Sequence, residues 1–236
     1  RWLKSKSKFN FTKAEWQSMP GSQTYEAHYF GRILSVPPTV RYHDEDGNPL
    51  LGPSASDGNQ NYQADKWQID NESEKFSMTQ ALQVDFMKGL YLRTSMNWYY
   101  SDSYYENFTK DYEQSPGVFN KTRSTSAEFH RTFDQTYNAV LNFNRRFAEN
   151  HNVSALAGTE FYNTYTRFIK ASGSGAPTDD FGDLGLTDAG ANKRSIDTDH
   201  QRRKIFSYFG SLSYDFKDRY LVNAIFRSDG YSTIHK

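Results

Sequence analysis

Histidine side chains, frequent carriers of acid–base and metal chemistry, are scattered along this sequence. None stands in the HExxH spacing of a zinc hydrolase or beside a nucleophile signature. The histidines are His28, His43, His130, His151, His200 and His235. We interpret them as ordinary polar positions. The sequence therefore predicts no catalytic residue, no cofactor and no enzyme activity.

Acidic side chains gather in the run Asp44-Glu45-Asp46-Gly47-Asn48, and carboxylate oxygens are ligands that calcium prefers. The run lacks the full EF-hand loop and its closing glutamate, so we interpret it as an acidic turn. A looser group at Asp179, Asp180 and Asp183 gives a weaker signal. We predict no metal site, although the pattern leaves open whether a calcium ion sits in the acidic loops.

Aromatic residues make up 17% of the chain and give a stronger signal. Tyr104, Tyr105 and Tyr112 fall in a polar stretch that we expect to be a loop. Tyrosine rings can stack on the apolar face of a sugar or on a peptide side chain. These three residues are our candidate substrate-binding positions, and packing among the loops is the alternative.

A second group of aromatic residues falls where predicted strands end. Trp98 and Tyr100 come where a strand meets a long loop, and Phe86 and Phe216 lie near short turns. Transmembrane barrels carry aromatic girdles at both membrane interfaces. We therefore predict that these four side chains lie at the membrane interface.

Alternation of apolar and polar residues predicts the hairpins that position these aromatic residues. One hairpin runs from Phe206 to Phe216 and, after Lys217-Asp218-Arg219, resumes at Tyr220. Pairing Phe216 with Tyr220 puts both apolar sets on one face of the hairpin.

A second hairpin pairs Phe86 with Leu90, which brings Phe76 opposite Tyr100 over strands of 11 residues. Strands of soluble domains are usually about 5 to 6 residues long, whereas a tilted membrane strand needs about 9 to 11. Strand length therefore favours a membrane barrel.

Weaker patterns predict the remaining elements. A third pair of strands, apolar at Phe129 to Phe143 and again from Val153, flanks a short turn. Arg1 to Phe11 is a further candidate strand, and the capping-box spacing at Thr12 to Glu15 predicts a helical turn that ends by Met19.

Short and long connections alternate along the chain. The turns near 87, 149 and 217 are short, whereas 12–74, 101–124 and 168–203 are predicted as long extracellular loops. Short turns on one rim and long loops on the other are typical of outer-membrane barrels, which have about eight strands or more. The predicted fold is an all-β, antiparallel up-and-down transmembrane β-barrel segment, with about six or seven strands of a larger barrel across residues 1–236.

Composition narrows the function classes. The 28 basic and 28 acidic residues balance, which gives no argument for nucleic-acid binding. The mean hydropathy of −0.87 excludes apolar membrane helices but not barrel strands, which show only one face to lipid. The chain opens on RWLKSKSKF without an apolar signal segment, so we expect it to be an interior piece of an exported precursor.

Three short motifs carry a family resemblance. SYFG at 207–210, YDFKDRYL at 214–221 and FRSDGYS at 226–232 resemble a barrel segment of SusC-type TonB-dependent outer-membrane transporters of Gram-negative bacteria. The resemblance implies a plugged barrel of about 22 strands in the lipid bilayer of the cell outer membrane. It also implies import of oligosaccharides or peptides as nutrients, with a SusD-like surface lipoprotein and with the TonB complex acting through regions that this chain does not include.

Other functions stay open at this level. A surface glycan-binding protein or adhesin without transport would also use long loops on a barrel. A soluble β-sandwich that binds glycan would show a similar alternation. The sequence does not identify the cargo.

Overall fold

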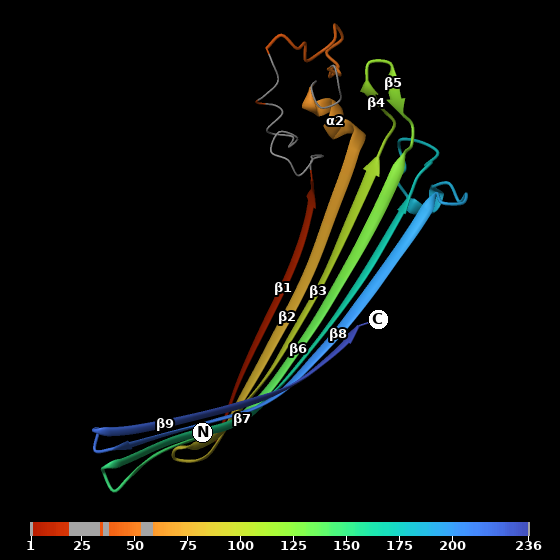
Figure 1. The fold of residues 1–236 in the computed structure, drawn as a ribbon. Helices are drawn as coiled ribbons and strands as arrows, with labels where there is room; N and C mark the ends of the chain where they lie inside the picture. The colour runs from red at the N-terminus through yellow and green to blue at the C-terminus, as the bar shows by residue number, and fades with distance from the viewer. Residues whose placement is uncertain (1, 19–33, 35–37, 53–58, 236) are drawn as a thin grey trace.

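A single antiparallel sheet of seven strands dominates the computed structural model, which describes residues 2–18, 34, 38–52 and 59–235 (Figure 1). The strands are β1 (Leu3–Gln17), β2 (Trp67–Met87), β3 (Leu90–Thr109), β6 (Ser124–Phe147), β7 (His151–Gly173), β8 (Arg194–Phe216) and β9 (Tyr220–His235). They lie in chain order and each pairs antiparallel with the next. The up-and-down arrangement predicted from the sequence is confirmed.

Smaller elements gather at one end of the sheet. They are α2 (Gln60–Lys66), the ribbon of β4 (Tyr112–Ser115) and β5 (Val118–Asn120), and the 3-10 turn η2 (Leu184–Leu186). Figure 1 shows α2, β4 and β5 at the end opposite the three short hairpin turns. We call these the loop end and the turn end. No helix among the described residues is long and apolar enough to cross a membrane.

The predicted hairpin registers are confirmed along the strands. Phe216 pairs with Tyr220, and Phe76 pairs with Tyr100. At the β2–β3 turn the prediction needs correction, because Leu90 pairs with Met87 and the register shifts between Asp85 and Met87. The turn therefore contains Lys88 and Gly89 alone, and Gly89 supplies a positive φ of 88° that other residues adopt only with strain.

The strand predicted near the start of the chain is present, but the helical turn predicted from Thr12 is wrong. Residues 12–17 continue β1, where Thr12 pairs with Lys75 and Gln17 pairs with Asp70. Backbone pairing with β2 overrides the local capping-box pattern. Met19 lies outside the described residues.

The loops predicted at 12–74, 101–124 and 168–203 are shorter than expected, because the flanking strands extend into those ranges. Residues 12–17, 67–74, 101–109, 168–173 and 194–203 belong to strands, and β6 begins at Ser124. These strand ends carry polar residues on both faces, for example Ser73 opposite Ser103 on one face and Glu74 opposite Asp102 on the other. Backbone pairing thus continues after the apolar alternation has ended.

The two faces of the sheet differ in chemistry. Pairing across all seven strands gives one row of apolar or small residues: Leu3, Val84, Leu92, Leu141, Ala157, Gly210 and Phe226. A row on the opposite side contains Lys6, Ala81, Ser95, Asn138, Glu160, Ser207 and Asp229. We call these sides the apolar face and the polar face.

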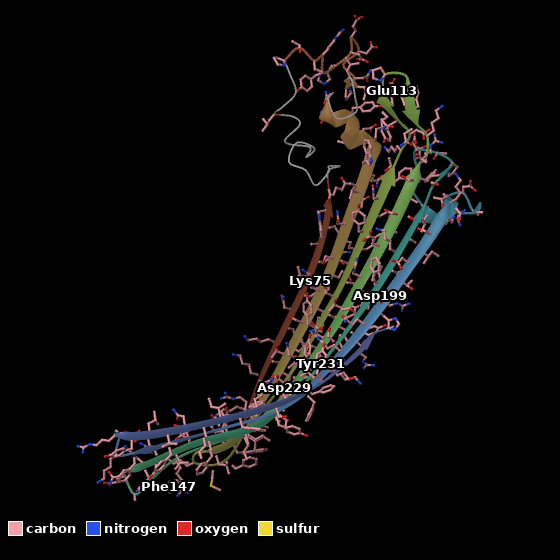
Figure 2. The ribbon with its side chains drawn as sticks, viewed as in Figure 1. Lys75, Glu113, Phe147, Asp199, Asp229 and Tyr231 are labelled. Carbon is pink, nitrogen blue, oxygen red and sulfur yellow. The ribbon has the colours of Figure 1, made fainter. Side chains whose placement is uncertain are left out.

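The sheet has no conventional core. The buried hydrophobic residues of the described chain are Phe108 and Ala176, whereas Tyr208 and Leu212 of β8 stay 55% and 49% exposed although β8 has a neighbour on each side. Figure 2 shows side chains standing on both sides of one layer of strands. A soluble β-sandwich needs a second large sheet over its apolar face. The described residues form one large sheet and a small ribbon, which argues against the sandwich.

Candidate functional site

An aromatic row crosses the apolar face toward the loop end. Its members are direct neighbours on five adjacent strands: Phe11, Phe76, Tyr100, Phe133 and Tyr165. Tyr100 was predicted at such a position, and its ring centroid lies 6.4 Å from that of Phe133. Beyond this row, toward the loop end, a charged side chain follows on the same face of each of the five strands.

The apolar face has the height of a membrane core. Ten residue steps separate Leu90 at the turn end from Tyr100 in the aromatic row. At about 3.4 Å per residue they span about 34 Å along the strand. With the strand tilt of about 40° typical of membrane barrels, the height is about 26 Å, close to the apolar band of about 25 Å in such barrels.

The other predicted interface residues lie on the same face. Trp98 lies two residues before Tyr100 on β3, on the turn-end side of the aromatic row. Its indole Nε1 donates to the Tyr137 hydroxyl at 2.7 Å. At the turn end, Phe86 is 56% exposed and the Phe216 ring lies 6.4 Å from that of Tyr220. Their contact with lipid remains a prediction.

The three candidate substrate-binding tyrosines do not come together. Tyr104 and Tyr105 belong to β3 rather than to a loop, and as consecutive strand residues they point to opposite faces. Tyr104 donates to Glu106 at 3.3 Å on the apolar side. Tyr112 lies in β4 with its ring 4.5 Å from that of Trp67, which is packing among loop-end elements.

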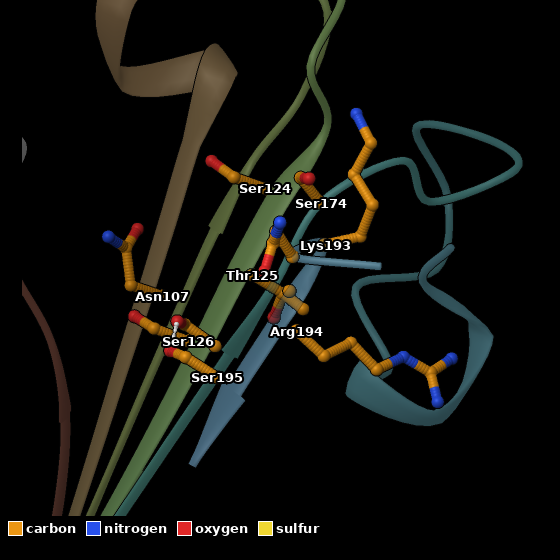
Figure 3. A pocket seen from close by; sticks show the side chains of 11 residues that line it. Asn107, Ser124, Thr125, Ser126, Ser174, Lys193, Arg194 and Ser195 are labelled. Atoms are coloured by element: carbon orange, nitrogen blue, oxygen red, sulfur yellow. Dashed lines mark hydrogen bonds between the residues drawn. The ribbon is translucent and has the colours of Figure 1, made fainter. Parts of the chain in front are cut away.

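A row of short polar side chains crosses the polar face at the loop end. Asn107, Ser126, Ser172 and Ser195 are direct neighbours on β3, β6, β7 and β8 (Figure 3). The hydroxyls of Ser172 and Ser195 lie 2.8 Å apart. Adjacent members stand about 4.8 Å apart, the spacing of paired strands. We call these four residues the hydroxyl row.

The hydroxyl row lines a cavity of about 330 Å³. Its other walls include Ser124, Ser174 and Lys193, and the Asn107 Oδ1 atom is buried without a hydrogen-bond partner among the described residues. Figure 3 shows Arg194 turned toward the loop, where it donates to the Gly185 carbonyl at 3.0 Å. The cavity is therefore lined mainly by uncharged donors and acceptors.

A second row with charged members lies next to the hydroxyl row, one step toward the turn end. It contains Tyr105, Glu128, Lys170 and Asp197. Lys170 Nζ lies 2.5 Å from Glu128 Oε1, and this hydrogen bond raises the pKa of Lys170. Lys170 remains about half exposed, so the pair faces solvent on the polar face.

Ion pairs tie the loops above the rows together. Arg123 contacts Asp111 at 2.8 Å and Asp179 at 2.9 Å, which joins the β3–β6 connection to the β7–β8 connection. Burial pushes the pKa of Asp179 up, but the Asp111 amide and the Arg123 guanidinium outweigh burial and hold it below its usual value. Gly182 packs on Phe108, since a Cβ at Gly182 would lie 2.6 Å from the Phe108 ring. We call this assembly the loop clamp.

The acidic run at Asp44 forms a closed turn. One Asp44 oxygen accepts from the Asp46 and Asn48 amides at 2.9 and 2.8 Å, and the other accepts from Asn48 Nδ2 at 3.0 Å. Asp179, of the second acidic group, serves the loop clamp. No cluster of three or more His, Cys, Asp or Glu residues suited to a metal ion occurs within the described ranges.

Comparison with known proteins agrees with this geometry. No family model matches the chain. TonB-dependent receptor P26 of Formosa agariphila is 23% identical over 212 residues, which cover 86% of this chain and 21% of that protein. The chain resembles SusC-type TonB-dependent transporters. The resemblance given by the three short motifs is therefore confirmed.

Solved structures show the same fold. The RagAB peptide importer in its open-open state matches 98% of this chain and 26% of that chain, with a TM-score of 0.79 and 19% identity. The closed-closed state gives a TM-score of 0.77 at 18% identity. The chain thus spans about a fifth of the curated relative and about a quarter of these structures. The matched proteins are named as a receptor and as importers, not as enzymes.

The hydroxyl row was not predicted from the sequence. Serine and asparagine are common in loops, and Ser126, Ser172 and Ser195 fall in or next to ranges that we expected to be irregular. Their alignment requires the register of the β6–β7 and β7–β8 strand pairs, and a long connection separates β7 from β8. The sequence signal that was available is that polar residues recur at every second position near the loop ends of β6, β7 and β8.

Proposed function

We propose that this chain forms a seven-stranded part of the barrel wall of an outer-membrane TonB-dependent importer. The observation that carries the proposal is the similarity to a TonB-dependent receptor over 86% of the chain. The exposed apolar face, with the height of a bilayer core, supports the membrane location. The polar face then lines the interior, as in other barrels with hydrated lumens.

The hydroxyl row and the charged row next to it suit a polar cargo. Hydroxyl and amide groups exchange hydrogen bonds with sugar hydroxyls and with peptide groups alike. Oligosaccharides and peptides are therefore the cargo classes we propose, and the fold shared with the RagAB peptide importer supports peptides. A SusD-like surface lipoprotein and the TonB complex are the proposed partners, and the TonB complex would act through regions that this chain does not include.

Gene deletion tests this function. Cells that lack the gene should lose growth on one class of oligosaccharide or peptide, and a plasmid copy should restore it. The tagged protein should fractionate with the outer membrane and co-purify with a surface lipoprotein. Recovery of the protein in the soluble fraction would contradict the proposed transport function.

Surface protease treatment of intact cells tests the orientation. Cuts confined to the long connections at the loop end would place that end outside the cell. Cuts at Lys88 and Gly89, or at Lys217 to Arg219, would show that the turn end faces outward and would contradict the proposed orientation.

A further inference from the structure

Charge is unevenly distributed on the apolar face just beyond the aromatic row. The next row contains Lys13, Glu74, Asp102, Arg131, Arg167 and His200 on consecutive strands. On β1 to β3 this face carries carboxylates. On β6, β7 and β8 the described positions of this face include no Asp or Glu, although arginine and lysine recur there.

Two of these cations lack a protein partner. Arg131 is neutralised by Asp102, whose carboxylate it contacts at 2.9 and 2.7 Å. Arg167 is exposed, and neither Arg167 nor Lys204 has a hydrogen-bond or ion-pair partner among the described residues. Their positive charges are therefore available to a ligand.

Arg202 is held in place by a polar chain. Its Nε donates to Asn163 Oδ1 at 3.1 Å, and Asn163 Nδ2 donates to Gln135 Oε1 at 2.9 Å. Asn163 is only 4% exposed on an otherwise apolar face. The hydrogen bond at Nε leaves the two terminal nitrogens of the guanidinium free of partners within the described chain.

Arg167, Arg202 and Lys204 form one patch, which we call the basic patch. Arg202 pairs with Tyr165, so it lies diagonal to Arg167, about 7 to 8 Å away. Lys204 follows Arg202 by two residues on the same face, about 7 Å along the strand. Three cations thus stand within the reach of one multiply charged anion.

We propose that the basic patch binds the phosphate groups of lipid headgroups in the membrane leaflet at the loop end. Guanidinium groups match phosphate oxygens in geometry and charge. Tyr165 of the aromatic row stands beside Arg202, which is the level where lipid headgroups meet the hydrocarbon. Clusters of arginine and lysine at this level attract anionic lipids. The occupant is a lipid because the apolar face continues from the patch toward the turn end.

The test uses the full-length barrel protein that contains this chain, purified in mild detergent. The variant replaces Arg167, Arg202 and Lys204 with glutamine. The matched control is Arg203→Gln, because Arg203 lies between Arg202 and Lys204 on β8 but faces the polar side. Native mass spectrometry measures binding of lipid A, of dephosphorylated lipid A and of inorganic phosphate, and heat-modifiable gel mobility checks folding.

The parent protein and Arg203→Gln should bind lipid A equally, and the triple variant should bind it at least about tenfold more weakly. Dephosphorylated lipid A should bind all three proteins weakly. Equal binding of lipid A by all three proteins would overturn the inference. So would inorganic phosphate binding as tightly as lipid A, or a triple variant that keeps lipid A and loses a protein partner.

This inference rests on the membrane location proposed above, but different results would overturn the lipid-binding inference and the membrane location. Soluble recovery of the protein would overturn both. Outer-membrane recovery with unchanged lipid A binding would overturn the inference alone.

Discussion

The hydroxyls of Ser172 on β7 and Ser195 on β8 lie 2.8 Å apart on the polar face at the loop end. Each hydroxyl carries one donor and two acceptor sites, so a single mutual hydrogen bond leaves most of their capacity to the cavity. The ion pairs of the loop clamp join the β3–β6 and β7–β8 connections at the same end of the sheet. Under the proposed function, this pair would be a point at which cargo exchanges hydrogen bonds with the barrel wall.

Valine at both positions tests this contact. Ser172→Val with Ser195→Val should weaken cargo binding about tenfold, because two hydrogen bonds of about 0.5 to 1.5 kcal/mol each are lost. Titration of the purified protein with the cargo found by the growth assay measures the effect. Thr198→Val, on the apolar face of β8, is the control and should bind as the parent does. Unchanged affinity for the cargo in the double variant would show that the hydroxyl row does not contact the cargo.

Gly89 fixes the β2–β3 turn in two ways. Its φ is +88°, and a Cβ at this position would overlap the backbone carbonyl of Asn144 on β6. Gly117 has a similar φ of +78° but open space around it. Gly89→Ala should therefore cost about 3 kcal/mol, against about 1 kcal/mol for Gly117→Ala. Urea unfolding in detergent micelles measures both, and equal losses would contradict the close approach to Asn144.

The loop clamp should weaken in acid. The pKa of Asp179 lies below its ordinary value of 3.8 in the folded protein, so its stabilisation is present above that value. The stabilisation is lost as the pH falls through the lowered pKa. Pepsin should accordingly cut the β7–β8 connection faster as the pH drops below about 4.

The Arg123→Gln variant isolates the ion pair with Asp179. Without the guanidinium the clamp is weakened at every pH, so a neutral protease should cut the same connection at pH 7. The parent should resist under these conditions. A variant that resists as well as the parent would show that Arg123 does not hold the loops.

The hairpins were predictable because their information is local. Strict alternation from Phe76 to Phe86 and from Phe206 to Phe216 fixes both the face and the register of each strand. The strand ends were not predictable from alternation, because polar residues occupy both faces there. Tyr104 and Tyr105 were assigned to a loop for this reason, although β3 continues to Thr109.

Contacts between distant strands required the structure. Ser126, Ser172 and Ser195 are neighbours only because the β6–β7 and β7–β8 strand pairs keep a continuous register to the loop end. The basic patch depends in the same way on Arg167 and Arg202 facing the same side of adjacent strands. In the sequence, even Ser172 and Ser195 are 23 positions apart.

Spin labelling along β3 tests the central claim, that the apolar face meets lipid and the polar face does not. The chain contains no cysteine, so each substitution adds the one thiol of this segment. Single cysteines would replace the apolar-face residues Leu92, Thr94 and Met96 and the polar-face residues Arg93, Ser95 and Asn97. Nitroxides on the apolar face should collide often with oxygen and rarely with a water-soluble nickel chelate, whereas those on the polar face should show low oxygen accessibility. An accessibility that does not alternate along β3, or nickel chelate reaching Leu92 and Met96, would contradict the membrane barrel.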